Sequence, residues 1–322
     1  RDELGREAAH AARRFSAPVV GPQFEGLYRE VADKQTPAPA PAPATNGHAR
    51  RKREVPPRIL MLAQSYAPTI GGEERLVQDL SRELVLRGHS VSVATLTPTA
   101  ATQDDGVAVH VLGSSTYRLP LRFQDAGRRH AVPAPDPETV ADLRQVIKAE
   151  RPDVIHAHNW LVHSYLPLRR ILGIPVVMSL HDYALICATK RLFRDGTVCS
   201  GPGLMKCAQC AGGQYGRWLG AGLAGTIALS SRYALERVDR FVAISDAVRD
   251  ACGLHGDPRC RLIPNLVRPL PAPVAAPEPL LRKLPAEPYV LFFGDATVDK
   301  GAALLARVYD EIPAAPPLVF VG

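Results

Sequence analysis

The sequence predicts an α/β fold with a parallel sheet, and the main evidence lies between Arg58 and Thr97. This stretch begins with an unbroken apolar run, Ile59 to Ala63, which is typical of strands covered on both faces. Leucines at positions 76, 80 and 84 then recur at helical spacing, and Val91 to Leu96 is predicted as a second strand. Together they predict a β-α-β unit, in which ligands bind at the carboxyl ends of the strands.

The remaining elements extend the same pattern. Apolar runs predict strands at 107–112, 154–158, 175–180, 241–244 and 289–293. Asp136 and Pro137 have the chemistry of a helix N-cap and first position, and they predict a helix that continues to the turn before residue 154. A longer helix is predicted over 214–237. Its small-residue middle, GAGLAG, permits close approach of a neighbouring element, and both core packing and a membrane-surface contact are open for it.

Composition narrows the class of protein. The length of 322 residues favours two domains. The net charge of +7 makes anionic partners plausible, namely nucleotide phosphates, acidic glycans or an anionic membrane surface. No run is long enough to span a bilayer, we expect no signal peptide, and six cysteines in such a chain do not predict a secreted disulfide scaffold. We therefore expect a cytoplasmic protein, with any membrane contact peripheral at the inner face. The basic run at 50–53 lies in an Ala/Pro linker and is interpreted as solvated rather than as a nucleic-acid site.

A family resemblance is carried by the motif P-x-x-GG-E-E-x-x-V-x-x-L-x-x-x-L-x-x-RGH-x-V-x-V. It resembles the opening of the family 4 glycosyltransferases, which are retaining enzymes of the GT-B fold. The residues that match the pattern are Pro68, Gly71, Gly72, Glu73, Gly88 and His89. The segments PDVIHAHNW and RVDRFVAISDAVRDAC and the IPN element at 263–265 are also similar to that family.

The resemblance implies a domain organisation. Residues 58–268 form a GT-B-type Rossmann-like N-terminal domain on the acceptor side, with a Cys-rich insert at 187–210. Residues 269–288 are the interdomain connection, and 289–322 are only the first βαβ portion of a second, nucleotide-sugar-binding domain. Residues 1–34 resemble the C-terminal helical tail of another such enzyme, or are an ordinary helical extension, and 35–57 are an Ala/Pro linker. On this view the chain is a fragment that is inactive alone.

The same resemblance implies the site residues. His181 follows the strand at 175–180, stands where the family contacts the reacting sugar, and is the expected catalytic residue. The residues expected to bind donor or acceptor are Gly71, Gly72, Glu73, His158, Asp182, Ser245, Asn265, Gly294, Lys300 and Gly301. A plain tight turn at the glycines and simple helix capping by Asp182 remain open. Asp295 stands where the family has a phosphate-binding arginine, and Leu266 departs from the usual continuation of the IPN element.

Four cysteines form a separate candidate site. Cys207 and Cys210 are a C-x-x-C pair, and Cys187 and Cys199 precede them across a Gly/Pro-rich loop. Four thiolates can close a tetrahedral structural zinc site. Reduced thiols and a redox pair are the alternatives.

These observations favour one function over two others. The resemblance implies a retaining glycosyltransferase that moves a sugar from a nucleotide-sugar donor to a glycan or lipid-linked acceptor in polysaccharide biosynthesis, with no cofactor required for the chemistry. The alternatives are a non-catalytic GT-B-like binding module and a nucleotide-sugar epimerase of the same fold.

Overall fold

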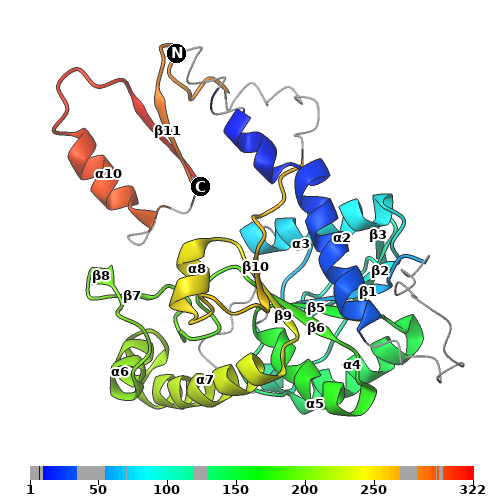
Figure 1. Ribbon diagram of the computed structural model, residues 1–322. Helices are drawn as coiled ribbons and strands as arrows, with labels where there is room; N and C mark the ends of the chain where they lie inside the picture. The colour runs from blue at the N-terminus through cyan, green and yellow to red at the C-terminus, as the bar shows by residue number, and fades with distance from the viewer. Residues whose placement is uncertain are drawn as a thin grey trace, which may run out of the picture. The chain divides into compact units, whose positions relative to one another are not determined.

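The computed structural model describes residues 7, 10–34, 55–69, 71–118, 130–268, 281–294, 296 and 300–322. Contacts divide the chain into a larger unit, 1–268, and a smaller one, 269–322. The larger unit is an α/β structure around an eight-stranded sheet (Figure 1). The α/β fold and the mostly parallel sheet are as the sequence predicts.

The sheet has the order β10-β9-β6-β5-β1-β2-β4-β3, and all neighbours are parallel except β3 and β4. Its strands are β1 (Ile59–Ala63), β2 (Val91–Thr95), β3 (Gln103–Asp104), β4 (Val107–Val111), β5 (Val154–His158), β6 (Val176–Leu180), β9 (Arg240–Ala243) and β10 (Cys260–Leu262). The chain runs outward from β1 through β2 and β4 and then returns to β5 on the other side of β1. The switch point of the sheet, where α/β proteins bind ligands, therefore lies between β1 and β5.

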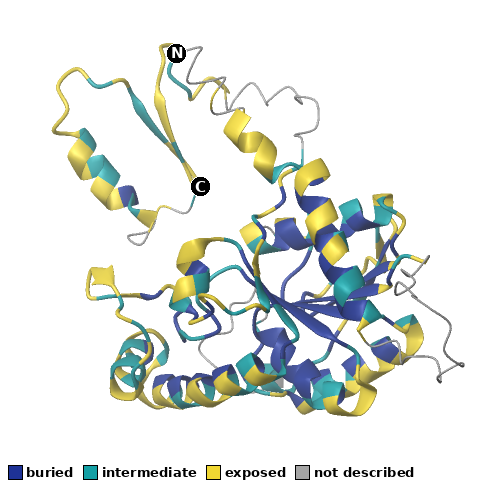
Figure 2. Ribbon diagram, in the orientation of Figure 1, coloured by how far each residue is buried: buried dark blue, intermediate teal, exposed yellow. Residues whose placement is uncertain are grey.

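Helices cover both faces of the sheet (Figure 1). Ile59, Met61 and Ala63 point toward α2 (Ala17–Asp33) and α3 (Gly72–Leu86), whereas Leu60 and Leu62 join the core beneath the helices on the other face. Those helices are α4 (Pro137–Glu150), α5 (Val162–Leu172) and α7 (Arg217–Arg237). The central strands are buried throughout, as Figure 2 shows, which explains their unbroken apolar runs.

Helix α2 belongs to the core of the larger unit. Its buried side chains recur at helical spacing and include Val20, Phe24 and Tyr28. Ser16, just before α2, forms a parallel bridge with Val267, and the Val267 amide donates to the Phe15 carbonyl at 2.8 Å. The segment that the sequence assigns to a tail is therefore packed on the sheet.

The shorter elements complete the larger unit. They are the 3-10 turns η1 (Arg13–Phe15), η2 (Ser115–Arg118) and η3 (Asn159–Leu161), a small hairpin of β7 (Phe193–Arg194) and β8 (Thr197–Val198), and helices α6 (Leu204–Tyr215) and α8 (Asp246–Ala251). The helix predicted over 214–237 is wrong at its start, because Gly216 at φ 90° separates α6 from α7. No helix among the described residues is long and apolar enough to cross a membrane.

The described residues of the smaller unit contain a β-α-β element. Strand β11 (Val290–Phe293) pairs in parallel with β12 (Leu318–Val321), and α10 (Ala302–Tyr309) connects them. Phe292 and Phe320 lie opposite each other with ring centroids 5.2 Å apart.

Candidate functional site

The candidate site lies at the carboxyl edge of the central strands. Because β1, β5 and β6 are parallel and in register, Ala63, His158 and Ser179 lie side by side near that edge. The segments that follow these strands meet there. They carry Glu73 at the start of α3, Asn159 after β5, and His181 with Asp182 after β6.

Two histidines form the centre of the site. His158 Nδ1 and His181 Nε2 are 2.8 Å apart, and the two rings stack with centroids at 5.1 Å and an interplanar angle of 9°. One ring donates a proton and the other accepts it. In either tautomer, one N–H and one lone pair remain, at His158 Nε2 and His181 Nδ1.

A third histidine supports this pair from the α2 side. His156 packs against His158 with ring centroids 4.2 Å apart. Burial raises the pKa of Tyr28, so its hydroxyl keeps its proton and donates it to His156 Nδ1 at 2.7 Å. His156 Nε2 then carries the ring proton and donates to Ser179 Oγ at 2.8 Å. Tyr28 thus fixes the tautomer of the histidine beneath the site.

Acidic and basic groups surround the histidines. Asn159 Nδ2 donates to Glu73 Oε2 at 2.9 Å, which ties the start of α3 to the end of β5. Asn159 has φ 64°, a left-handed conformation that asparagine tolerates better than most residues. Lys190 Nζ lies 4.4 Å from the centre of the Trp160 ring and interacts electrostatically with Asp182 and Glu73.

Burial governs the protonation of the whole group. It lowers the pKa of His181 to about 4 and that of His158 well below its ordinary value, so both are neutral at pH 7. It raises the pKa of the Glu73 and Asp182 carboxyls and lowers the pKa of the Lys190 amine. The site therefore offers neutral imidazoles beside a compact cluster of three carboxyls, of which Glu74 is the third, and an amine.

Three buried polar atoms of the site have no hydrogen-bond partner among the described residues. They are Glu73 Oε1, His158 Nε2 and His181 Nδ1. An unsatisfied buried polar group costs about 1–3 kcal/mol, so folded proteins rarely keep several together. At the switch point of the sheet, these three atoms are available to hydrogen-bond a polar ligand.

The other residues predicted in the larger unit lie around this edge with less specific contacts. Gly71 is the extended N-cap of α3, and a Cβ on Gly72 would meet no atom within 4 Å, so the approach to this helix end is open. Asp182 Oδ1 accepts the Ala184 amide at 2.7 Å in a turn rather than at a helix start. Ser245 caps α8 through the Val248 amide at 3.3 Å, and Asn265 is exposed after β10.

The residues predicted to bind the donor diphosphate lie in the smaller unit. Gly294 and Gly301 have φ values of 134° and 76°, which glycine adopts readily, and Gly301 is the N-cap of α10. Lys300 is exposed. Asp295 lies outside the described residues.

The four cysteines converge on one small cavity. Cys187, Cys199, Cys207 and Cys210 all line a space of about 20 Å³, and each has a free thiol. The Gly203 amide donates to Cys207 Sγ at 3.3 Å. Within the described residues, no three His, Cys, Asp or Glu side chains are arranged so that they could hold a metal ion. Structural zinc therefore stays a prediction, and no step of the chemistry is assigned to it.

Three residues of the site were not predicted from the sequence: Asn159, Trp160 and Lys190. Asn159 and Trp160 stand immediately after His158, so the rule that ligands meet the carboxyl ends of parallel strands could have found them. Lys190 gives no such signal, because it reaches the site only through a turn that folds back on the chain. A hydrogen bond from the Tyr183 amide to the Lys190 carbonyl at 3.3 Å holds this turn.

Comparison with known proteins points to one family. A family model described as "Glycosyl transferase 4-like domain" matches residues 71–266. Glycogen synthase of Mycobacterium tuberculosis is 29% identical over 137 residues, which cover 38% of this chain and 33% of that protein, so the chain matches about a third of this curated relative. The structure of sucrose-phosphate synthase from Thermosynechococcus elongatus superposes with a TM-score of 0.55 at 18% identity, over 83% of this chain and 62% of that one. At this identity the likeness concerns the fold alone.

Proposed function

This chain belongs to the family of glycosyl transferase 4-like domains, and we propose that the edge around His181 holds an acceptor and the reacting sugar during retaining transfer from a nucleotide sugar. The acceptor is a glycan or a lipid-linked sugar in polysaccharide biosynthesis. The single observation that carries the proposal is the group of three unused polar atoms, Glu73 Oε1, His158 Nε2 and His181 Nδ1, at the switch point of the sheet.

The chemistry that these residues can support follows from their charges. In a retaining transfer, the bond from the anomeric carbon to the diphosphate breaks, and a bond to the acceptor oxygen forms on the same face. The acceptor proton leaves on a diphosphate oxygen, and positive charge develops on the sugar ring. Neutral His181 hydrogen-bonds a sugar hydroxyl through Nδ1 without adding repulsion. In this proposal, the Glu73 and Asp182 carboxyls stabilise the positive charge.

Lys190 has a positioning role in this scheme. Its ammonium lies against Trp160 and interacts with both carboxyls. Two buried carboxyls would otherwise repel each other and take up protons. The positive charge of the amine therefore opposes this protonation and draws the carboxyls together, facing the charge that forms on the sugar.

The test measures sugar transfer by the full-length protein and compares it with transfer by variants of that protein. Transfer from a panel of radiolabelled nucleotide sugars should fall about 10²–10³-fold in His181→Ala and Glu73→Gln, as for other lost hydrogen-bonding groups of active sites. His255→Ala is the control, because His255 is an exposed histidine of the same unit. A wild type that transfers no sugar from the panel would overturn the function. Unchanged rates in both variants would overturn the site.

A further inference from the structure

Helices α6 and α7 follow each other across Gly216 and pack together, and residues 204–237 are here called the α6–α7 hairpin. The two helices approach closely because Gly220 has no side chain, and a Cβ there would collide with the backbone of Ala211 and Gly212. The hairpin packs on the rest of the unit through Leu223 and Ile227, which are both buried. The other faces of α7 are largely exposed (Figure 2).

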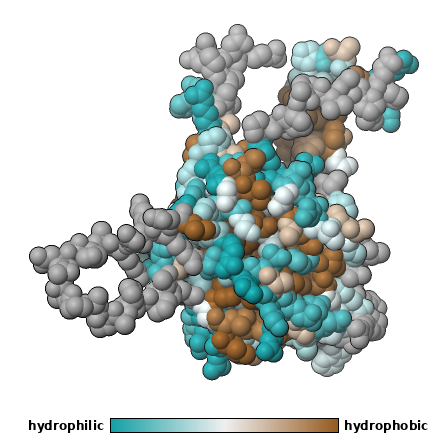
Figure 3. All heavy atoms as spheres, turned by 90° about the vertical axis from the view of Figure 1, so that its right-hand side faces the viewer, coloured by the Kyte–Doolittle hydropathy of each residue, from teal (hydrophilic) through white to brown (hydrophobic). Residues whose placement is uncertain are grey.

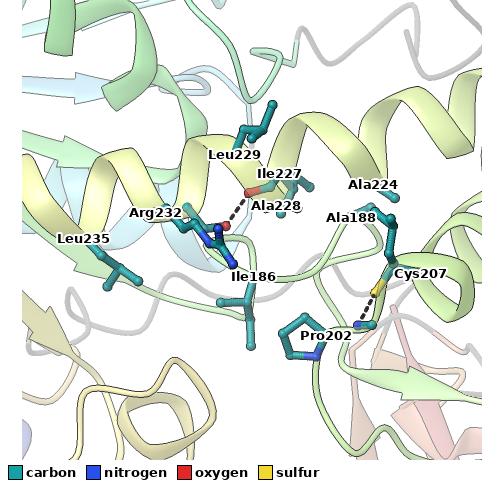
Figure 4. Close-up of a pocket in the computed structure, with 13 residues that line it drawn as sticks. Ile186, Ala188, Pro202, Cys207, Ala224, Ile227, Ala228, Leu229, Arg232 and Leu235 are labelled. Carbon is teal, nitrogen blue, oxygen red and sulfur yellow. Dashed lines mark hydrogen bonds between the residues drawn. The ribbon is translucent and has the colours of Figure 1, made fainter.

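A groove of about 530 Å³ runs between α7 and the segments at 186–188 and 202–207 (Figure 4). Its walls are mainly apolar and include Ile186, Pro202, Ile227 and Leu235. Among the described residues that line it, Arg232 alone is charged. The volume falls within the range of about 300–1,000 Å³ typical of pockets for small, mainly apolar ligands.

Large apolar side chains also gather on the outside of this region. Eight such side chains in the described part of the larger unit are more than 70% exposed, and five of them lie between residues 198 and 229. They are Val198, Leu204, Met205, Trp218 and Leu229. By contrast, polar and apolar residues are interspersed on the face of the unit seen in Figure 3. Exposed apolar residues scattered singly are ordinary, but a concentration of this kind marks an interaction surface.

The charge of the region identifies the partner. Residues 191–237 contain six basic and two acidic side chains, a net charge of +4. Arg217 lies over the Trp218 ring at 5.6 Å, and neither Arg217 nor Arg232 makes an ion pair among the described residues. A second copy of this chain, with its net charge of +7, would be repelled. Exposed leucine, methionine and tryptophan beside unpaired arginines match the interface of an anionic bilayer.

The groove is also connected to the candidate site. Ile186 and Ala188 line the groove, and the same turn carries Asp182 and Lys190. Ser231 Oγ of α7 donates to the Leu185 carbonyl at 2.6 Å, which fastens this turn to the hairpin. A lipid chain in the groove would therefore lie against the segment that positions the charged groups of the site.

We propose that the α6–α7 hairpin binds the surface of an anionic phospholipid bilayer, with an acyl chain in the groove and Arg217 and Arg232 on the lipid phosphates. The proposal extends the proposed function, because it names the membrane surface at which the protein encounters a lipid-linked acceptor. Vesicle binding requires no sugar transfer, however, so each proposal can fail without the other.

The experiment uses the two tryptophans of the chain. Trp160 is 5% exposed and Trp218 is 84% exposed, so only Trp218 can enter a bilayer. Vesicles of phosphatidylglycerol and phosphatidylcholine with brominated acyl chains should sediment the protein and quench part of its fluorescence. The quenching should disappear in Trp218→Phe. Replacing Arg217 and Arg232 by glutamine should weaken binding about fivefold each, and added salt should weaken it further.

A matched pair of substitutions localises the contact. Leu229→Glu on α7 should weaken vesicle binding, whereas Leu86→Glu at the end of α3 should not, although both leucines are more than 70% exposed. Ala228→Trp, which fills the groove, should weaken binding while leaving the fold intact as judged by circular dichroism. Absence of binding to phosphatidylglycerol vesicles overturns the proposal. So does binding without quenching of Trp218, equal binding to pure phosphatidylcholine, or an equal effect of the two leucine variants.

Discussion

The hydroxyl of Tyr28 offers the sharpest test of how the site is supported. Tyr28 is fully buried, and its hydroxyl donates to His156 Nδ1 at 2.7 Å from a helix that lies 128 residues earlier in the chain. Tyr28→Phe keeps the ring and its contact with Phe24, where the ring centroids are 6.0 Å apart, and removes only the hydroxyl. The substitution leaves His156 Nδ1 buried without a partner.

The size of the effect follows from that orphaned nitrogen. A neutral hydrogen bond contributes about 0.5–1.5 kcal/mol net, and a buried acceptor left without a partner costs about 1–3 kcal/mol. We therefore expect Tyr28→Phe to lower the free energy of unfolding of the larger unit by about 1–3 kcal/mol. Urea unfolding should be followed by Trp160 fluorescence in a Trp218→Phe background, because Trp160 lies in the core of that unit.

A double-mutant cycle with His156→Leu separates this bond from other effects of the substitution. Without the imidazole, Tyr28→Phe should cost at least about 1 kcal/mol less than it does beside His156. An equal cost in both backgrounds would show that the hydroxyl acts through something other than His156. The account of how His156 is held beneath the site would then be refuted.

Three further predictions follow from the same structure. Burial lowers the pKa of His156 from 6.5 to about 3 and that of His181 from 6.5 to about 4. Both histidines are therefore neutral in the folded protein, and below pH 6.5 they take up protons when the protein unfolds. The free energy of unfolding should therefore fall as the pH is lowered from 6.5 to 4, by up to about 1.4 kcal/mol per pH unit for each histidine. Urea titrations that give the same free energy of unfolding across this pH range would contradict the prediction. Gly220→Ala should destabilise the hairpin by about 1–3 kcal/mol in thermal unfolding, whereas Gly222→Ala, whose Cβ meets nothing within 4 Å, should be neutral or stabilising. For the cysteines, the zinc site predicted from their spacing requires the four thiols to rearrange, and metal analysis of reduced protein that finds less than about half an equivalent per chain would reject the site.

Much of the fold could be predicted because its signals are local. The buried strands are short apolar runs bounded by turns, so β1, β5 and β6 are visible one at a time in the sequence. The parallel order then brings the residues after each strand to one edge. This is how Glu73 and His181, which are far apart in sequence, could be expected near each other before any coordinates.

The rest depends on contacts between distant segments. Lys190 reaches the site through an irregular turn, and no periodicity in the sequence predicts the path of that turn. Its amine interacts electrostatically with Glu73, which lies on another element. The break at Gly216 was missed because a lone glycine inside a helical pattern does not by itself end a helix. The small residues themselves were informative, since a Cβ at Gly220 of the GAGLAG segment would collide with the backbone of α6.

Helix α2 changes how the candidate site is understood. In sequence it is a short segment separated from β1 by an Ala/Pro linker, and nothing local ties it to the histidines. In the structure, its Tyr28 fixes the tautomer of His156, His156 packs against His158, and His158 hydrogen-bonds His181. A packed chain of this kind transmits the position of α2 to the ring that faces the ligand, because a dense core leaves few alternative arrangements. The linker therefore connects two parts of one site, and α2 has a role in positioning the candidate catalytic histidine as well as in covering the sheet.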